Sequence, residues 1–437
     1  MDLRILPAIK KYASKNPVRL HMPGHKGKKS FSKIFPSASL DVTELDVIEN
    51  DKVLRLAEED VAKIMGVKHS IFLTGGATSG IISMVLAVKD LGKKIIINRG
   101  AHKSVYCAIE KFDLEPVFVE DLPSVDEISR VCNCDDVIGA LLTYPDYYGN
   151  TFDIRAIKKV LEKNKKLLLI DNAHGGHFNF IDGLVYAGEV SDAHVDGLHK
   201  TFCTLNQGAL LCINNDNLFE KVKDASDFIL TTSPSYVLLS SIEYGVKFMD
   251  AWKDSKESLR FFDDLHNLEK NLALNEIPTL ISDDPFKMQI DLVGLNIDPY
   301  EAQKVIEKAG VFCEMNDNNS LLFMFSPLTS KKDFNRLYKA LIEVKKTCKR
   351  NHYNFQFTPQ IKAKTEIGYL EARKSEYYTV DLSDAIGLVA HENVGLFPPC
   401  MPVVVAGEKF TKETVDCLRK GKNLFGVDNG KVKVCKR

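Results

Sequence analysis

The chain has 437 residues, of which 45% are hydrophobic and 27% are charged, and its formal net charge is −1. These values indicate a globular protein of two or three domains. A nearly neutral chain has no overall field to attract nucleic acid or an anionic membrane, and no apolar run reaches the roughly 18 residues of a membrane helix. Charges interrupt the apolar residues of Met1–Lys11, unlike a secretory signal, so we expect a cytoplasmic protein with reduced cysteines.

The first half of the chain alternates between helical and extended patterns. In chain order, the expected elements are a helix at Ser79–Asp90, apolar strands at Lys94–Asn98 and Val137–Thr143, a helix at Ile154–Lys163 and an almost wholly apolar strand at Leu167–Asp171. Strands that are apolar on both faces and alternate with helices indicate a parallel sheet buried between helix layers.

The pattern changes after a charged helical stretch at Trp252–Leu274. The elements expected next are a strand at Phe286–Leu292, a helix at Tyr300–Ala309, a strand at Ser320–Phe325 and a helix at Lys331–Lys346. This alternation suits a smaller α+β domain that follows the α/β domain.

A glycine-rich loop, Thr74–Gly80, follows the apolar Ile71–Leu73 and opens the first expected helix. Glycines allow close approach of the backbone to a ligand, and the N–H groups of a helix start favour an anion such as phosphate. The loop lacks the lysine of a Walker motif. A plain glycine turn with a helix cap is the alternative interpretation.

Two further features follow in order. Asp171 ends a buried strand, where α/β sheets bind ligands, and a protonated pyridine nitrogen would be a suitable partner for its carboxylate. Lys200 follows His199, and its amine could become a nucleophile if its pKa were lowered. Taken alone, each could be structural: a turn aspartate and a surface lysine. A phosphate loop, then an acid, then a lysine is the order of a pyridoxal-phosphate (PLP) site.

Other short motifs are spread along the chain. They are His21-Met22-Pro23-Gly24-His25-Lys26, Asp41-Val42-Thr43-Glu44-Leu45, Ala101-His102-Lys103-Ser104, Tyr147-Tyr148-Gly149, Asp171-Asn172-Ala173-His174-Gly175, His199-Lys200-Thr201, Thr231-Thr232-Ser233-Pro234-Ser235-Tyr236 and Phe397-Pro398-Pro399. With the glycine loop, they resemble the Orn/Lys/Arg decarboxylases, PLP enzymes of the aspartate-aminotransferase fold, over nearly the whole chain. The long forms' N-terminal receiver-like domain is absent, so the chain resembles the short form.

The resemblance implies an α/β fold: a mostly parallel, seven-stranded type of PLP-binding sheet between helices, with a smaller α+β C-terminal part. We expect four regions: a 1–60 arm that contributes to the site and the dimer, a 61–252 PLP-binding domain, a 253–350 small domain and a 351–437 C-terminal subdomain. The implied reaction is decarboxylation of arginine, lysine or ornithine to agmatine, cadaverine or putrescine. Short forms often act on arginine or lysine.

The resemblance also implies the catalytic residues. Lys200 would bond to the cofactor, Asp171 would pair with its ring nitrogen, and His102 would stack on its ring. His199 would contact the cofactor beside the lysine, and Ala173 would pack on the opposite ring face.

The remaining implied contacts concern the phosphate and the subunit interface. Gly76, Ala77 and Thr78 would hold the phosphate. Thr232 and Ser233 would reach into the partner subunit's site, which implies a homodimer or a higher homo-oligomer with shared active sites.

A basic substrate needs an acid for its far end. We expect Glu392 to supply it and His25 to lie near the site, although Asp381, Asp384 and plain surface charge remain alternatives. No metal is expected, because the histidines near Lys200 have no cysteine pair beside them.

Three positions depart from the family pattern. Gly197 stands where a phosphate-binding serine is common, Asn172 stands where glutamate is usual, and Cys400 stands where glycine usually follows the paired prolines.

Two other functions stay open. The first is an aminotransferase or lyase on the same fold. An aminotransferase would need a carboxylate-binding arginine in the small domain, where the residues from Asn275 to Cys348 include only Arg336, within an amphipathic helix. The second is a catalytically silent PLP-binding homologue, against which the intact set of Lys200, Asp171 and His102 argues.

Overall fold

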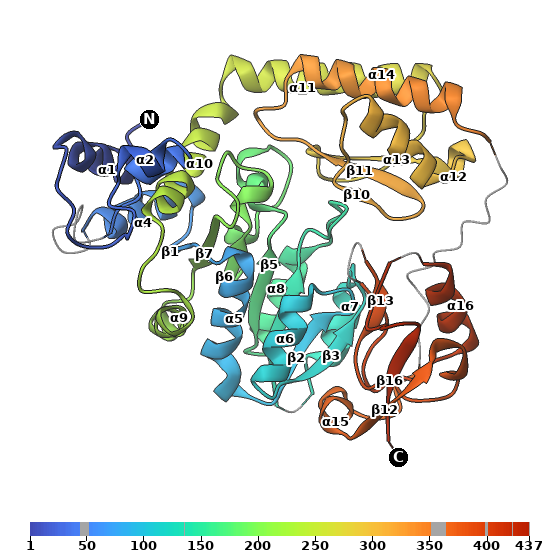
Figure 1. Cartoon of the computed structure of the whole chain (residues 1–437). Coiled ribbons are helices and arrows are strands. Elements are labelled where there is room, and N and C mark those ends of the chain that lie inside the picture. Colours follow the sequence, from blue (N-terminus) through green and yellow to red (C-terminus); the bar gives the residue numbers. More distant parts are fainter. Residues whose placement is uncertain (44–51, 135, 351–363, 398–400, 422, 437) are drawn as a thin grey trace. The chain divides into compact units, whose positions relative to one another are not determined.

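The computed structural model describes residues 1–43, 52–134, 136–350, 364–397, 401–421 and 423–436 (Figure 1). Parts of two motifs, Glu44-Leu45 and Pro398-Pro399, and the departure at Cys400 lie outside these residues. The chain divides into two compact units. The first comprises Met1–Gly92, Ile138–Pro145 and Phe152–Ser258, and the second comprises Lys93–Val137, Asp146–Thr151 and Leu259–Arg437.

The largest sheet has seven strands in the order β1-β7-β6-β5-β4-β2-β3. Parallel pairs join β2 to β3, β4 to β5 and β5 to β6, whereas β7 runs antiparallel to both β6 and β1. The expected α/β class with a mostly parallel sheet is therefore confirmed.

The first unit contains most of this sheet. Its elements are α1 (Ile5–Ser14), α2 (Lys29–Ser32), η1 (Pro36–Ser39), α4 (Lys52–Met65), β1 (His69–Leu73), α5 (Gly76–Val88), η2 (Lys89–Leu91), β4 (Val137–Thr143), α8 (Ile154–Lys163), β5 (Leu167–Asn172), η3 (Gly176–Phe180), η4 (Ala187–Glu189), β6 (Ala193–Asp196), η5 (Leu198–Lys200), β7 (Ala209–Ile213), α9 (Asp216–Ile229) and α10 (Tyr236–Lys253).

The central strands of the first unit form because their residues are apolar on both faces. Leu168, Leu169 and Ile170 of β5 are each at most 1% exposed, as expected for a strand covered on both sides. On one side, α5 lies so close that a Cβ on Gly80 would come within 2.6 Å of Val195 in β6. This close contact identifies the sheet face on which α5 packs.

The second unit contains three smaller sheets besides β2 and β3. Its elements are β2 (Lys94–Asn98), α6 (Lys103–Lys111), β3 (Glu115–Val119), α7 (Val125–Val131), α11 (Lys256–Leu274), β8 (Thr279–Leu280), β9 (Lys287–Asp291), α12 (Leu292–Leu295), α13 (Pro299–Lys308), β10 (Met315–Asn316), β11 (Ser320–Met324), α14 (Lys331–Thr347), α15 (Tyr369–Lys374), β12 (Tyr377–Asp381), η6 (Leu382–Asp384), β13 (Val394–Leu396), β14 (Pro402–Val404), α16 (Lys412–Lys420), β15 (Leu424–Phe425) and β16 (Lys431–Cys435).

A four-stranded sheet, β10-β11-β9-β8, forms the expected α+β part of the second unit. Figure 1 shows α11 and α14 running side by side, and the Phe261 and Phe334 rings of these helices lie 5.6 Å apart between centroids. The C-terminal segment forms two further small sheets, β12-β16 and β14-β13-β15, around their own buried core.

Two further properties bear on the expectations. Among the described residues, no helix combines the length and the apolar character that a membrane crossing requires. The nine described cysteines form no disulfide.

Candidate active site

Two neighbouring parallel strands bring the predicted acid and the predicted lysine to one edge of the sheet. The register pairs Asp171 of β5 with Val195 of β6, and Asn172 with Asp196. Successive side chains of a strand point to opposite faces. Asp171 therefore shares the α5 face with Val195, while Asn172 and Asp196 share the other face.

Asp171 is 3% exposed, and its carboxylate has one hydrogen-bond partner among the described residues. Its Oδ1 accepts a hydrogen bond of 3.2 Å from the Ala173 backbone N–H. Asp171 therefore does stabilise the turn after β5, which is the structural role that the sequence left open for it. The second oxygen, Oδ2, has no hydrogen bond among the described residues, so it remains available to a ligand. A buried charged oxygen of this kind favours a cationic partner.

Lys200 ends the short helix η5, and its Nζ lies 2.8 Å from Nε2 of His174. His174 is 6% exposed and lies in the turn that follows β5. This imidazole can accept a proton from the ammonium group when its Nε2 is unprotonated. No catalytic role was predicted for His174 from the sequence. The available signal was its position three residues after Asp171.

The loop that follows Lys200 connects the glycine loop to His199. The Gly76 N–H donates to the Gln207 carbonyl at 3.0 Å. The His199 N–H donates to the Gly208 carbonyl at 3.1 Å, and Nδ1 of His199 lies at the same distance from that oxygen. Burial lowers the pKa of His199, which favours its neutral form. The predicted phosphate-binding Gly76 and the lysine-flanking His199 therefore both contact the loop that contains Gln207 and Gly208.

The start of α5 is open to an anion. Gly75 occupies the cap position, and no described side chain caps the helix. Gly76 has φ +70°, which favours glycine, and a Cβ there would meet no other group within 4 Å. Thr78 is exposed, whereas the Ser79 hydroxyl donates to the Gly76 carbonyl at 2.8 Å. The Gly76 N–H is engaged by the Gln207 carbonyl. The N–H groups of Ala77 and Thr78, which come next in the first turn, are therefore the ones available to a phosphate group.

The departure at Gly197 has a local structural reason. A Cβ on this residue would lie 2.6 Å from the Ala173 carbonyl oxygen and 3.2 Å from the Ala173 Cα. A serine at this position would therefore require the backbone to move. The ends of β5 and β6 approach each other more closely than a larger residue allows.

Three other predicted residues of the first unit lie elsewhere. Thr232 and Ser233 are exposed, in the loop between α9 and α10. Nε2 of His25 lies 3.0 Å from Oδ2 of Asp41, and its Nδ1 accepts from the Gly27 N–H. No described contact joins these three residues to Asp171 or Lys200.

His102 and Glu392 belong to the second unit. His102 is exposed and caps α6, where its Nδ1 accepts from the Ser104 N–H at 3.2 Å. The Glu392 carboxylate lies 3.3 Å from Nζ of Lys433 and 4.0 Å from a guanidinium nitrogen of Arg373. Each of these side chains is thus oriented by neighbours within its own unit.

The residues of the first unit fit PLP. Oδ2 of the buried Asp171 has no hydrogen-bond partner among the described residues and can accept from a protonated ring nitrogen. The Lys200 amine has an imidazole beside it, and the α5 start offers N–H groups to a phosphate. These are the groups through which proteins hold and tune this cofactor.

Comparison with known proteins identifies the family. The family model of the Orn/Lys/Arg decarboxylase major domain matches residues 5–281, well over half of the chain. The chain belongs to the Orn/Lys/Arg decarboxylase family. Membership makes it a PLP-dependent amino-acid decarboxylase, as the motifs predicted.

Individual relatives extend the match beyond residue 281. YaaO of Bacillus subtilis (strain 168) is 28% identical, with 96% of this chain and 94% of YaaO covered. The arginine decarboxylase of the same organism is 26% identical, with 94% and 92% covered. The structure of the Escherichia coli constitutive lysine decarboxylase superposes with a TM-score of 0.78 at 19% identity, covering 99% of this chain and 82% of that one, and shows the shared fold.

Proposed function

We propose that this decarboxylase acts on a basic amino acid, with arginine as the leading substrate and agmatine as its product. The observation that carries the proposal is the pairing of a buried acid and an imidazole-linked lysine at the ends of adjacent strands. Arginine comes first because a curated relative of nearly full coverage bears that name. Lysine is second, as the named substrate of a structural neighbour.

PLP, when bound, supplies an aldehyde that bonds to amines and a ring that accepts the electrons left as CO2 departs. Asp171 would keep the ring nitrogen protonated, because its buried carboxylate favours a positive partner. Lys200 would be the residue bonded to the cofactor. Ala173 and His102 would pack on the ring, and Gly76, Ala77 and Thr78 would bind the phosphate.

Proton transfer falls to the residues around Lys200. The contact of 2.8 Å between Nζ of Lys200 and Nε2 of His174 gives the ammonium proton an acceptor, and a deprotonated amine is the reactive form. A proton must also be returned to the substrate Cα after CO2 leaves. Lys200 and His199 are the candidates for that step.

For the substrate's distal group, Glu392 and His25 remain the proposed contacts. A guanidinium group pairs well with a carboxylate, because two parallel N–H donors match its two oxygens. The Lys433 and Arg373 contacts show that the Glu392 side chain is already held in a cationic environment. A substrate would have to compete with these cations.

We also propose a cytoplasmic homodimer or larger homo-oligomer with shared sites, in which Thr232 and Ser233 serve the partner's site. Their exposure in the α9–α10 loop leaves them accessible to a second subunit. The lack of disulfides among the described cysteines is compatible with a reducing compartment.

An assay of CO2 release tests the proposal. The purified protein with PLP should release CO2 from arginine, with lysine and ornithine as comparison substrates, and Lys200→Ala should abolish the release. Keto-acid formation without CO2 would instead indicate an aminotransferase. Arg336 is a poor substrate anchor for that reaction, because its Nε donates to the Ala309 carbonyl at 2.8 Å. No reaction with any of the three amino acids would contradict the proposed substrate class.

A further inference from the structure

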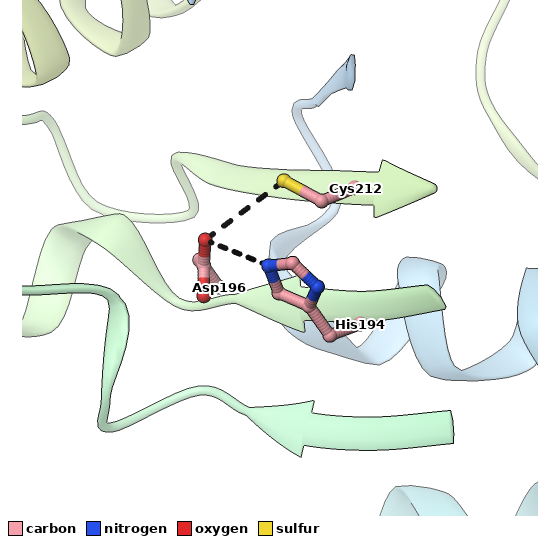
Figure 2. Close-up of side chains that lie close together, drawn as sticks. All are labelled: His194, Asp196 and Cys212. Atoms are coloured by element: carbon pink, nitrogen blue, oxygen red, sulfur yellow. Dashed lines mark hydrogen bonds and ion pairs between the residues drawn. The ribbon is translucent and has the colours of Figure 1, made fainter. Parts of the chain in front are cut away.

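A buried polar cluster lies behind the site, on the sheet face away from α5. Figure 2 shows His194 and Asp196 of β6 beside Cys212 of β7. All three are 0% exposed, and one ligand-capable atom from each lies within 4.8 Å of the others. Imidazole, carboxylate and thiolate together could form a metal site, so the contacts around them decide what the cluster is.

The Tyr186 hydroxyl lies within this cluster. Its oxygen is 2.7 Å from Oδ2 of Asp196 and 2.8 Å from Nε2 of His194. Burial and the neighbouring Asp196 raise the pKa of Tyr186 well above its ordinary value, so the hydroxyl keeps its proton and can donate it. Burial and Asp196 likewise raise the pKa of Cys212, which remains a thiol.

The contacts form hydrogen bonds that converge on the Asp196 carboxylate from two sides. We assign the proton of His194 to Nε2, because Nδ1 can then accept from Ser191 at 2.9 Å while Nε2 donates to Tyr186. Tyr186 donates to Oδ2 of Asp196, and the Asn172 side-chain amide donates to Oδ1 at 2.5 Å. The polar atoms that would bind a cation are thus engaged with one another.

These hydrogen bonds connect β5 and β6, the two strands that precede the predicted cofactor residues Asp171 and Lys200 or contain them. Asn172 directly follows Asp171, and Asp196 lies four residues before Lys200. The Asn172–Asp196 bond therefore fixes the separation and register of the two strand ends from the face opposite to Asp171. The close approach of Gly197 to the Ala173 carbonyl occurs one residue further along each strand. Both features hold the same two segments together.

We propose that Asp196, held by Tyr186 and Asn172, is a positioning residue that sets the spacing between Asp171 and Lys200 and thereby the affinity for PLP. The proposal rests on the proposed function. An amide at residue 172 is a donor that the Asp196 carboxylate can use, whereas a carboxylate there would repel it.

The test compares PLP binding and stability in matched variants. Asp196→Asn removes the charge, Tyr186→Phe removes one donor at the least steric cost, and the double variant Asn172→Asp with Asp196→Asn exchanges donor and acceptor. The control is Tyr144→Phe, since Tyr144 is buried in the same unit and its hydroxyl donates to the Val185 carbonyl at 3.0 Å. Apo proteins are titrated with PLP, and unfolding temperatures are measured with and without it.

A positioning role predicts that Asp196→Asn raises the PLP dissociation constant about tenfold, because a hydrogen bond to a charged group is lost. The stabilisation that PLP gives on heating should shrink. Tyr186→Phe should show the same change to a smaller extent, the exchange variant should recover part of the affinity, and Tyr144→Phe should bind PLP normally.

Three results would overturn the proposal. The first is unchanged PLP affinity in Asp196→Asn and Tyr186→Phe, with apo and PLP-bound forms destabilised equally, which would indicate a purely structural network. The second is a double variant, Asn172→Asp with Asp196→Asn, that binds PLP no more tightly than Asp196→Asn alone. The third is a stoichiometric metal in the wild-type protein that Cys212→Ser removes. If the wild-type protein itself binds no PLP, the proposed function fails and the positioning role fails with it.

Discussion

Each unit has a largely buried polar link, meaning a set of side-chain contacts that joins two segments of that unit, next to predicted cofactor residues. The two links are built differently. In the first unit, neutral donors on Tyr186 and Asn172 surround the carboxylate of Asp196. In the second unit, Arg99 and Glu408 form a charged pair with two contacts, of which the one between Nη2 and Oε2 measures 2.7 Å.

The second link spans much more of the chain. Arg99 follows β2 and precedes the His102 loop, whereas Glu408 lies in the C-terminal segment, 309 positions away. Arg99 also donates to the Val403 carbonyl, and the Gly100 N–H donates to Asp121 at 2.5 Å. The first link joins neighbouring strands and should control cofactor geometry. The second joins distant segments and should control the folding of its unit.

The largest effect should come from Asp171, the residue that the first link serves. Asp171→Ala should lower kcat/KM for decarboxylation on the order of a thousandfold, because the buried charge that stabilises a protonated ring nitrogen is lost. Stability without PLP should change little. Asp182→Ala, an exposed aspartate of the same unit, is the control. Activity of Asp171→Ala within a few fold of wild type would contradict its cofactor role.

Glu408→Ala should have the largest effect on stability. Arg99, whose side chain is 18% exposed, would lose its carboxylate partner. Breaking a buried pair reduces the free energy of unfolding by about 3–5 kcal/mol, and this value is the upper end expected here. Denaturant unfolding measures the change. Glu376→Ala serves as control, since the Glu376–Lys436 pair is exposed. If Glu408→Ala and Glu376→Ala behaved alike, the long-range pair would not stabilise the second unit.

The sequence predicted the elements well where apolar patterning dominates. The β4 strand, Val137–Thr143, and the α8 helix, Ile154–Lys163, have the expected bounds, and β5 extends only one residue further. The helix expected at Ser79 begins three residues earlier, at Gly76. The stretch expected as one helix at Trp252–Leu274 contains the end of α10 and the whole of α11.

The site was predictable only in part, for a physical reason. The order of Asp171 and Lys200 along the chain predicts strand ends at one sheet edge. The His174–Lys200 contact depends on the conformation of a turn, and the Asn172–Asp196 bond depends on strand register. Neither is encoded by a local pattern. The antiparallel direction of β7 was likewise not predicted, since a buried strand is apolar in either direction.

His174→Phe separates proton transfer from cofactor binding within the first unit. Loss of the acceptor beside Nζ of Lys200 should lower kcat about a hundredfold, the range of a general acid or base. PLP affinity should stay close to that of the wild type. The dependence of kcat on pH should also differ from that of the wild type. An unchanged pH profile would show that His174 does not handle a catalytic proton.

Glu392→Gln should have the smallest effect, and it tests the predicted substrate contact in the second unit. If Glu392 binds the distal cation, KM for the basic substrate should rise about tenfold with little change in kcat. Stability should fall only slightly, because the Lys433 pair is partly exposed. Steady-state kinetics measure both constants. A KM equal to that of the wild type would restrict Glu392 to its ion pairs with Lys433 and Arg373.

The most direct test of the account is to reduce the PLP-loaded protein with borohydride and to locate the attached cofactor by peptide mass spectrometry. We predict one pyridoxyl group per chain, on the peptide that contains Lys200, and none in Lys200→Ala. Attachment at another lysine, or no attachment to the wild-type protein, would contradict the assignment of Lys200.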